Sequence, residues 1–409
     1  MAMTVEPASP AIRQRTRRSP WEYRPVPDDE TPATDRPVGV DRPGMEPHHR
    51  RTVLRVILVT NLCLALVTAA AVILAFRHFD SNIGQGPPIR HHNTKAAKTP
   101  GQQHEPLNIL LMGSDTRDCT GCHVDGEAGG GVSDTTILLH VAADRRSAYG
   151  VSIPRDLLVD RPDCTVDGTV VPGGTQVLWN EAFALGGPEC TVEQVESVFT
   201  PVYVDEYLTI DFGGFKEMVD AINGVDVCIP VALDDPTYLH VHFDAGRSVH
   251  LDGTDALSYV RLRHVLSGTD IGRMKRQQSF IAAVTHKVLS ADTLTRPDRL
   301  LSFADALTGS LQASPDLASA GALVDLAREL EGADLTHIRF VTMPNFLYPE
   351  GTAGYPHVGL SPSYRSLVRR VHEDQPLGTF VRDSVSADGP KEHPSKDQED
   401  AAAAAGICA

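Results

Sequence analysis

The chain has 409 residues and a formal net charge of −16, with 53 acidic against 37 basic residues. Residues 1–55 hold ten arginines and eight acidic residues, a surplus of +2, so the rest of the chain carries −18. Because domains that bind nucleic acid are normally basic, this acidic remainder argues against a DNA-binding protein.

The N-terminal region predicts a tail followed by a membrane helix. The first 50 residues are rich in Pro, Arg, Asp and Glu, so they cannot bury enough apolar surface to offset the entropy of ordering, and we expect a disordered tail over 1–52. From Val56 to Phe76 the chain runs 21 residues without a charge, about the thickness of a bilayer core for a helix. We expect a transmembrane helix over 53–76. A cleaved signal peptide is the alternative, but its apolar region is usually shorter.

The positions of the cysteines suggest which side of the membrane the chain after the span occupies. The cytoplasmic side of a membrane span usually carries more Lys and Arg. Arginines flank both ends of this span, so this rule barely decides the orientation. Six of the seven cysteines follow the span, an even number compatible with disulfides in an oxidising compartment. We therefore expect a single-pass protein of the cell membrane, with a cytoplasmic N-terminus, an extracytoplasmic linker over 77–105 and a catalytic domain outside.

The segment 106–380 is expected to fold as one domain in which strands and helices alternate. Short apolar runs predict buried strands at 107–113, 135–143 and 147–153. Later patterns predict further strands at 207–212, 225–231 and 337–344. They also predict helices at 191–199, with a Thr191–Gln194 capping box, at 215–223 and at 270–290, and further helices near 297–331. This order indicates an α/β class: a layered α/β/α domain with a central mixed sheet, preceded by one transmembrane helix. The low-complexity segment 381–409 is expected to be disordered.

Two carboxylates stand at strand ends, where open α/β sheets usually place ligands. Asp115 follows the first strand and Asp134 directly precedes the second. Together they could hold Mg²⁺ (or Mn²⁺), which takes one or two protein carboxylates and completes its shell with water and phosphate oxygens. The alternative is that each is a turn or cap residue.

Basic side chains gather around the same strand ends. If 259–264 is extended, Arg261 and Arg263 point to the same side, whereas on a helix they would lie about 200° apart. Guanidinium groups grip phosphate oxygens bidentately, so this set suits a pyrophosphate, although surface ion pairs are the alternative. The candidate residues for pyrophosphate binding are Arg117, Arg155, Arg261, Arg263, Arg273, Arg276 and Gln277.

Six motifs occur in a fixed order after the apolar span: GSDTR, VSDTTILLHV, GVSIPRD, LTIDFGGFKEMVDAINGVDV, LDGTDALSYVRLRH and DIGRMKRQQ. Over 107–290 the chain resembles the LytR-CpsA-Psr family. The resemblance implies an α/β core that binds polyprenyl pyrophosphate lipids and transfers a lipid-linked glycopolymer onto peptidoglycan with Mg²⁺. It also implies metal binding by Asp115 and Asp134 and catalytic roles for Arg155, Arg261, Arg263 and Asp270. One departure is the stretch 118–132 between GSDTR and SDT, which could cover the site.

The expected reaction needs no covalent nucleophile. A sugar hydroxyl would attack the phosphorus nearest the glycopolymer and release polyprenyl phosphate, with Asp270 or Asp156 taking the proton. Two other functions use the same residues: a phosphohydrolase of polyprenyl pyrophosphate with water as acceptor, and a non-catalytic envelope sensor or transcription attenuator.

The cysteines leave their pairing open, because six allow fifteen connectivities. Cys164 and Cys190 flank one loop, and we favour a disulfide between them. Cys119 and Cys122 are candidates for a local pair, while Cys228 and Cys408 have no obvious partner.

Overall fold

The computed structural model describes most of the chain after residue 46. The described residues are 47–96, 102, 104–114, 131, 133–263, 265–266, 270–290, 293, 295–333, 335–386 and 394–408, without the side chains of 47–50, 270, 331 and 336. The chain divides into two compact units, Met1–Ala65 and Leu66–Ala409, and the second contains the folded domain.

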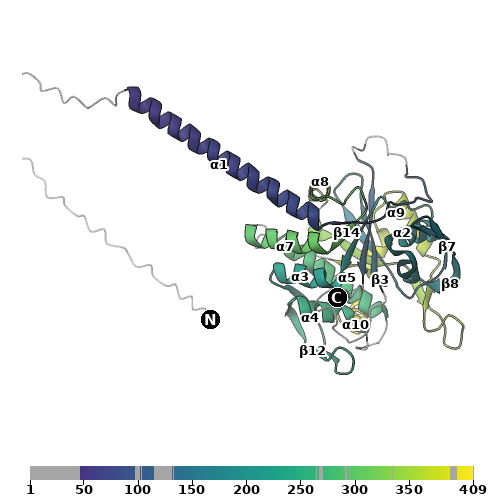
Figure 1. Ribbon diagram of the computed structural model, residues 1–409. Helices are drawn as coiled ribbons and strands as arrows, with labels where there is room; N and C mark the ends of the chain where they lie inside the picture. The colour runs from purple at the N-terminus through teal and green to yellow at the C-terminus, as the bar shows by residue number, and fades with distance from the viewer. Residues whose placement is uncertain are drawn as a thin grey trace, which may run out of the picture. The chain divides into compact units, whose positions relative to one another are not determined.

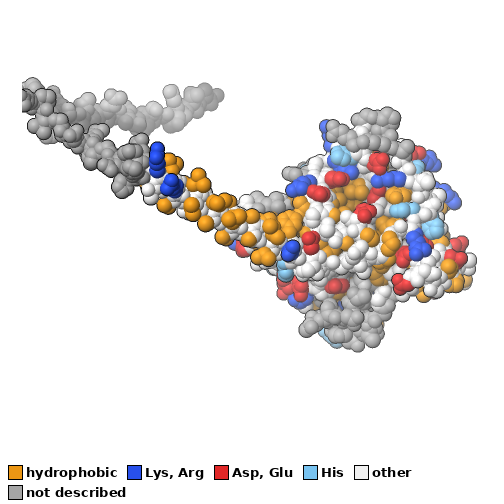
Figure 2. Space-filling view, turned by 45° about the horizontal axis from the view of Figure 1, so that its top comes forward, with side chains coloured by type: hydrophobic (Ala, Val, Ile, Leu, Met, Phe, Trp, Pro, Cys, Tyr) orange, Lys and Arg blue, Asp and Glu red, His pale blue; other side chains and the backbone are white. Residues whose placement is uncertain are grey.

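One long apolar helix precedes the domain. Helix α1 (Pro47–Asn82) contains the predicted span, and Arg51–Asn82 is a candidate membrane span by length and composition. None of its most apolar stretch is buried in the protein, and Figure 2 shows hydrophobic side chains uncovered along the helix. Such a surface needs lipid or another apolar partner.

The domain is built around an eight-stranded mixed sheet. Its strands in spatial order are β1 (Gly84–Gln85), β14 (Leu311–Ala313), β9 (Glu206–Asp211), β2 (Leu107–Ser114), β3 (Ser133–Val141), β4 (Ala148–Ile153), β15 (Arg339–Thr342) and β18 (Val385–Ser386). β2 is parallel to β9, β4 is parallel to β15, and β3 runs antiparallel between β2 and β4. The carboxyl ends of β2, β4, β9 and β15 therefore meet at one edge of the sheet, together with the start of β3.

Helices cover both faces of this sheet (Figure 1). Leu110 and Met112 of β2 pack in one core with α2 (Glu181–Val198) and α9 (Tyr364–His372). Ile109, whose side chain points to the other face, packs in a second core with α5 (Asp270–Val288) and α8 (Ala320–Glu331). The alternation along β2 follows from the two-residue period of a strand. The predicted α/β/α architecture is confirmed.

The remaining elements surround these layers. The other helices are α3 (Phe212–Ala221), α4 (Gly253–Arg261), α7 (Pro297–Ser310), α10 (Lys396–Ala405), η1 (Leu335–His337) and η2 (Gly378–Asp383). The two-stranded sheets pair β10 (Val225–Ile229) with β13 (Gly246–Leu251), β11 (Leu233–Asp235) with β12 (Val241–Phe243), β5 (Leu158–Arg161) with β8 (Gly174–Leu178), β6 (Cys164–Val166) with β7 (Thr169–Val171), and β16 (Asn345–Leu347) with β17 (Val358–Leu360). The strand predicted at 225–231 thus lies outside the central sheet.

The capping box predicted for helix 191–199 is wrong. α2 begins ten residues earlier, at Glu181, and continues through a kink at Gly186 and Gly187. The Thr191 hydroxyl donates to the Gly187 carbonyl at 2.8 Å, and the Gln194 amide donates to the Trp179 carbonyl at 2.9 Å. Both side chains are buried, so they satisfy nearby backbone carbonyls instead of capping a helix.

The described part of the C-terminal segment 381–409 is ordered, which differs from the expectation of disorder. β18 pairs with β15. α10 starts with a capping box formed by Ser395 and Gln398, and it ends at Gly406, whose φ is 73°. These caps satisfy backbone groups at both ends of an alanine-rich helix, which composition alone does not reveal.

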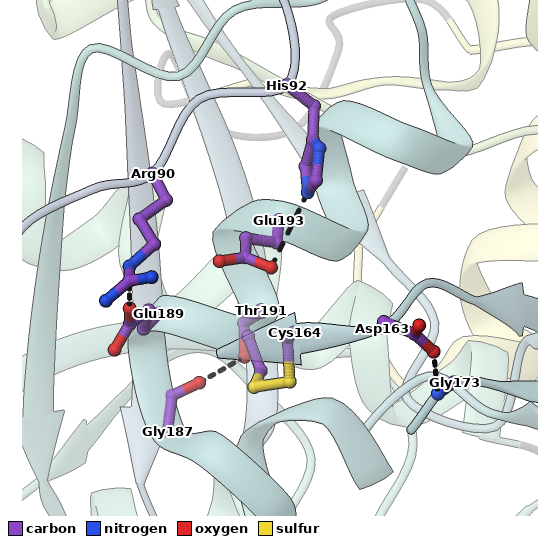
Figure 3. The surroundings of a disulfide bond; sticks show 10 residues. Arg90, His92, Asp163, Cys164, Gly173, Gly187, Glu189, Thr191 and Glu193 are labelled. Carbon is purple, nitrogen blue, oxygen red and sulfur yellow. Dashed lines mark hydrogen bonds and ion pairs between the residues drawn. A yellow bond between two sulfur atoms is a disulfide. The ribbon is translucent and has the colours of Figure 1, made fainter. Parts of the chain in front are cut away.

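Two disulfides join described cysteines. The predicted Cys164–Cys190 bond links β6 to α2, with its Cα atoms 5.3 Å apart (Figure 3). Cys228 of β10 pairs with Cys408 after α10, across a sequence separation of 180. The sequence offered no partner for these two, because separation in sequence says nothing about contact. Cys119 and Cys122 lie outside the described residues.

The linker after α1 is bound along the domain. β1 extends the sheet beside β14. Residues 90–93 contact acidic side chains of α2. Figure 3 shows Arg90 meeting Glu189 and His92 meeting Glu193, at 2.8 and 3.5 Å. The linker is therefore held in place by the domain, where the sequence suggested only a spacer.

Glu196 makes the densest set of these contacts. Its fully buried carboxylate binds His91 Nδ1 at 2.9 Å and accepts from the backbone N–H groups of His92, Asn93 and Val204 at 2.7, 3.1 and 3.0 Å. An amide in its place has one oxygen instead of two, so some of these buried donors would lose their acceptor.

We expect Glu196→Gln to lower the free energy of unfolding by about 2 kcal/mol and to expose residues 90–93 to protease. Urea unfolding and limited proteolysis of the full chain in detergent measure both effects. The control is Glu329→Gln, because the Glu329 side chain is 44% exposed where it meets Arg145 at 2.9 Å. This substitution should change stability by no more than about 0.5 kcal/mol. Equal effects of the two substitutions would contradict this account of the linker.

Candidate functional site

Asp134 occupies an irregular position at the start of β3. Gly113 pairs with Thr135 and Ser114 pairs with Ser133, so the register skips Asp134. A bulge of this kind turns a side chain away from the regular alternation of the strand. The Asp134 side chain is buried, with 5% of the residue exposed. The bulge therefore places one carboxylate at the sheet edge where β2, β4 and β9 end.

Three arginines surround this carboxylate. Arg155, which follows β4, donates from Nη1 to Asp134 Oδ1 at 2.8 Å. Arg263, which follows α4, reaches both carboxylate oxygens from Nη2 at 3.2 and 3.3 Å. Arg273 of α5 lies 3.5 Å from Oδ1 and donates to the Asp134 backbone carbonyl at 3.3 Å. We refer to Asp134, Arg155, Arg263 and Arg273 as the Asp134 cluster.

The three arginines differ in how far their side chains are exposed to solvent. The side chains of Arg273, Arg155 and Arg263 are 1%, 20% and 43% exposed. Arg273 is thus a fixed internal partner, whereas Arg155 and Arg263 reach solvent. An anion that approaches from outside would meet the last two first.

The arginines also control the protonation of Asp134. Burial alone would raise the pKa of this carboxyl group, but the positive charges of Arg273, Arg155 and Arg263 outweigh burial and hold the pKa well below its usual range. Asp134 is therefore ionised at neutral pH. The guanidinium groups of the cluster present planar N–H donors of the kind that bind anionic ligands.

Arg261 reaches the same edge of the sheet from α4. Its guanidinium lies 4.9 Å from the centre of the Phe212 ring, and the residue is 8% exposed. Phe212 starts α3 directly after β9, whose last residue, Asp211, pairs with Ser114 of β2. The contact is a cation–π interaction that fixes the guanidinium. The sequence pattern does not link Phe212 to Arg261. The one sequence signal for a site role of Phe212 is its position directly after a strand.

Arg276 and Gln277 bind backbone carbonyls near the ends of α4 and α10. Arg276 donates from Nη1 to Ala405 at 2.9 Å and from Nη2 to Leu262. Gln277 donates to the Val260 carbonyl at 3.3 Å. These contacts brace the segment that carries Arg261 and Arg263.

Some of the predicted site residues are not described. Asp115, Arg117, Cys119 and Cys122 lie outside the described residues, and only the backbone of Asp270 is described, as the first residue of α5. Asp156 follows Arg155 and is half-buried.

Comparison with known proteins identifies the family. The model of the LytR_cpsA_psr family matches residues 81–356. The chain belongs to the LytR-CpsA-Psr family. The match contains the whole Asp134 cluster and both helices, α4 and α5, that contribute to it.

Relatives within this family are about one-third identical to the chain over the aligned residues. The cell wall biosynthesis protein LcpA of Corynebacterium glutamicum is 32% identical over 64% of this chain and 53% of the relative. The polyisoprenyl-teichoic acid–peptidoglycan teichoic acid transferase TagU of Enterococcus faecalis is 33% identical over 48% of this chain and 58% of the relative. The chain thus spans little more than half the length of either.

A solved structure agrees with the fold of this LytR-CpsA-Psr chain. A protein from Streptococcus agalactiae superimposes with a TM-score of 0.54 at 21% identity, covering 67% of this chain and 90% of the other. This likeness concerns the α/β architecture.

The described residues fit part of a metal site in this LytR-CpsA-Psr domain. Asp134 is ionised, as a ligand of Mg²⁺ must be. Among the described residues no group of three or more His, Cys, Asp or Glu side chains could hold a metal. Because guanidinium groups surround Asp134, a divalent cation would bind beside it together with phosphate oxygens that offset the positive charge.

Proposed function

We propose that this chain transfers a glycopolymer from a polyprenyl-pyrophosphate lipid onto peptidoglycan in a reaction that depends on Mg²⁺ or Mn²⁺. The observation that carries the proposal is the Asp134 cluster at the sheet edge of a LytR-CpsA-Psr chain. Its guanidinium groups offer the planar donors that suit a pyrophosphate. The name of TagU, a teichoic acid transferase acting on peptidoglycan, supports the same class of substrate and acceptor.

The proposed reaction assigns a role to the members of the cluster. A sugar hydroxyl of peptidoglycan attacks the phosphorus nearest the glycopolymer, a phosphodiester forms, and the bond to the bridging oxygen breaks. Polyprenyl phosphate leaves, and the hydroxyl proton passes to Asp156 or Asp270. Arg155 and Arg263 neutralise the charge that develops on the phosphate oxygens, while buried Arg273 keeps Asp134 in place. A metal held by Asp134 and Asp115 would add further charge stabilisation.

We also propose that the domain is extracytoplasmic and anchored by α1, with the N-terminus in the cytoplasm. The candidate span in α1 supports the anchor. The disulfides Cys164–Cys190 and Cys228–Cys408 support an oxidising compartment for the domain. A lipid-linked substrate and a cell wall acceptor both meet the domain there.

Turnover of a synthetic polyprenyl-pyrophosphate glycan tests the proposal. The full chain in detergent is incubated with peptidoglycan fragments, with Mg²⁺ or with a chelator. We expect a glycan-phosphate adduct of peptidoglycan with Mg²⁺, and a loss of about 10²-fold or more in rate with the chelator.

The other outcomes each overturn a stated part of the proposal. Free phosphorylated glycan in place of the adduct would indicate a hydrolase. Binding of the lipid without turnover would indicate a sensor. Equal transfer with and without the chelator would remove the metal from the reaction.

A further inference from the structure

The C-terminal residues of the described chain form a buried segment beside the site. Residues 405–408, which we call the C-terminal clasp, begin at the last residue of α10 and end at the Cys228–Cys408 disulfide. Ala405 and Ile407 are 7% and 5% exposed. Figure 1 shows α10 close to α5, the helix that carries Arg273.

Arg276 connects the clasp to the arginines of the site. One arm of its guanidinium donates to the Ala405 carbonyl of the clasp, and the other donates to the carbonyl of Leu262. Leu262 stands between Arg261 and Arg263 in the chain, and Arg276 is 2% exposed. A planar guanidinium can hold two carbonyls in a fixed relation, which a flexible ammonium cannot do.

A second contact joins the clasp to the same loop. The backbone of Gly406 lies so close to Leu266 that a Cβ there would meet the Leu266 side chain at 3.1 Å. Leu266 belongs to the loop between α4 and α5, which starts at Leu262 and carries Arg263. The clasp therefore packs against this loop and is also hydrogen-bonded to it through Arg276.

Packing alone holds α10 weakly. A cavity of about 530 Å³ lies among α10, α5, β10 and the segment 382–386, and the residues of α10 that line it include Ala401, Ala402 and Ala405. Alanine buries little apolar surface, so such a helix gains little from contact with α5. The disulfide and the Arg276 bridge supply the attachment that the alanines do not.

We propose that the C-terminal clasp, fixed by Cys228–Cys408, is a positioning element of the anion site that acts through Arg276 on the Leu262 backbone. This inference rests on the proposed function of the Asp134 cluster. Arg263 is 43% exposed and contacts Asp134 at 3.2 Å, so its placement depends on the loop backbone. Release of the clasp lets Arg263, which follows Leu262, move from the position that binds pyrophosphate.

The test compares two disulfide variants of the full chain in detergent. Cys228→Ala/Cys408→Ala releases the clasp. Cys164→Ala/Cys190→Ala is the matched control, because that disulfide joins β6 to α2 on the face of the sheet opposite α5. Each variant is assayed for binding of geranylgeranyl pyrophosphate, for kcat and KM of glycan transfer, and for its unfolding temperature.

We expect the clasp variant to weaken pyrophosphate binding and raise KM by about tenfold or more, at temperatures where it remains folded. The control variant should lose stability with less than about a twofold change in binding, since its disulfide does not position the loop. Binding by the clasp variant equal to wild type would overturn the positioning role. Failure of wild type to bind geranylgeranyl pyrophosphate would instead overturn the proposed function.

Arg276→Lys supplies a second test with both disulfides intact. Lysine keeps the positive charge but cannot bridge the Ala405 and Leu262 carbonyls in the same plane. We expect this variant to bind geranylgeranyl pyrophosphate about tenfold more weakly, like the clasp variant. Wild-type binding by Arg276→Lys would show that only the charge of Arg276 matters and would overturn the bridge.

Discussion

Replacing Arg155 or Arg263 with alanine is expected to abolish glycan transfer while the domain stays folded. Each substitution removes a guanidinium that reaches solvent and contacts Asp134, at 2.8 Å for Arg155 and 3.2 Å for Arg263. Loss of one such preorganised charge typically costs about 10²–10³-fold in rate. Either variant still leaves Asp134 with two arginines, so the buried carboxylate keeps partners and the fold is retained.

The measurement is kcat/KM for the lipid-linked glycan, together with an unfolding curve for each variant. Arg328→Ala is the control, because Arg328 is 71% exposed and pairs with Asp325 on the surface of α8. It should match wild type in rate and in unfolding. A rate within about tenfold of wild type for both Arg155→Ala and Arg263→Ala would exclude the Asp134 cluster as the reaction site.

Asp134→Asn is expected to be the most destabilising substitution in the site. It removes the negative charge that three guanidinium groups contact, and Arg273 among them is 1% exposed. Breaking a buried ion pair in this way typically costs about 3–5 kcal/mol. We also expect transfer to be lost, because the proposed metal loses one of its ligands.

The pH dependence of this effect has a defined sign. The folded pKa of Asp134 lies below the unfolded value of about 3.9, so its contribution to stability is complete above that value. As the pH falls below about 4, the unfolded state takes up a proton before the folded state does, and the contribution declines. The difference in unfolding free energy between wild type and Asp134→Asn should therefore be constant from pH 7 to 5 and smaller at pH 3.5.

Urea unfolding of both proteins at these pH values measures the difference, and other carboxylates cancel because both proteins contain them. Asp325→Asn, at a position 73% exposed, is the control and should change little at any pH. If the difference were the same at pH 3.5 as at pH 7, Asp134 would not be held in its ionised form by the arginines.

The central sheet was predictable because its strands are nearly continuous apolar runs. The segments 107–113, 135–143 and 147–153 became β2, β3 and β4 within two residues at each end. Strands buried on both faces have this pattern, which needs no knowledge of distant contacts. The arginines after β4 and α4 were predictable for a related reason, since strand ends at one edge of a sheet bring their following residues together.

The features that the sequence did not predict depend on contacts between distant residues. The bulge at Asp134 arises from the pairing of β2 with β3 and has no local sequence signal. From the sequence, Glu196 would be taken for a solvent-exposed acid on a helix. In the structure the linker covers it, and the His92 N–H donates to its carboxylate. Within 259–263, Arg261 is the last residue of α4 and Leu262 is extended. Arg261 is therefore helical, and Arg263 lies beyond the helix.

The long-range disulfide also sets the order in which the site can be completed during synthesis. Cys164 and Cys190 are separated by 26 residues and can pair early, whereas Cys228 must wait for a partner 180 residues later. At about 5–20 residues per second, that interval is roughly 10–40 s. The strands of the central sheet and the arginines of the site would therefore be synthesised before the clasp can bind Leu262 through Arg276. Full affinity for the lipid would arrive last, so a chain truncated before Ala405 would bind lipid-linked substrate about tenfold more weakly.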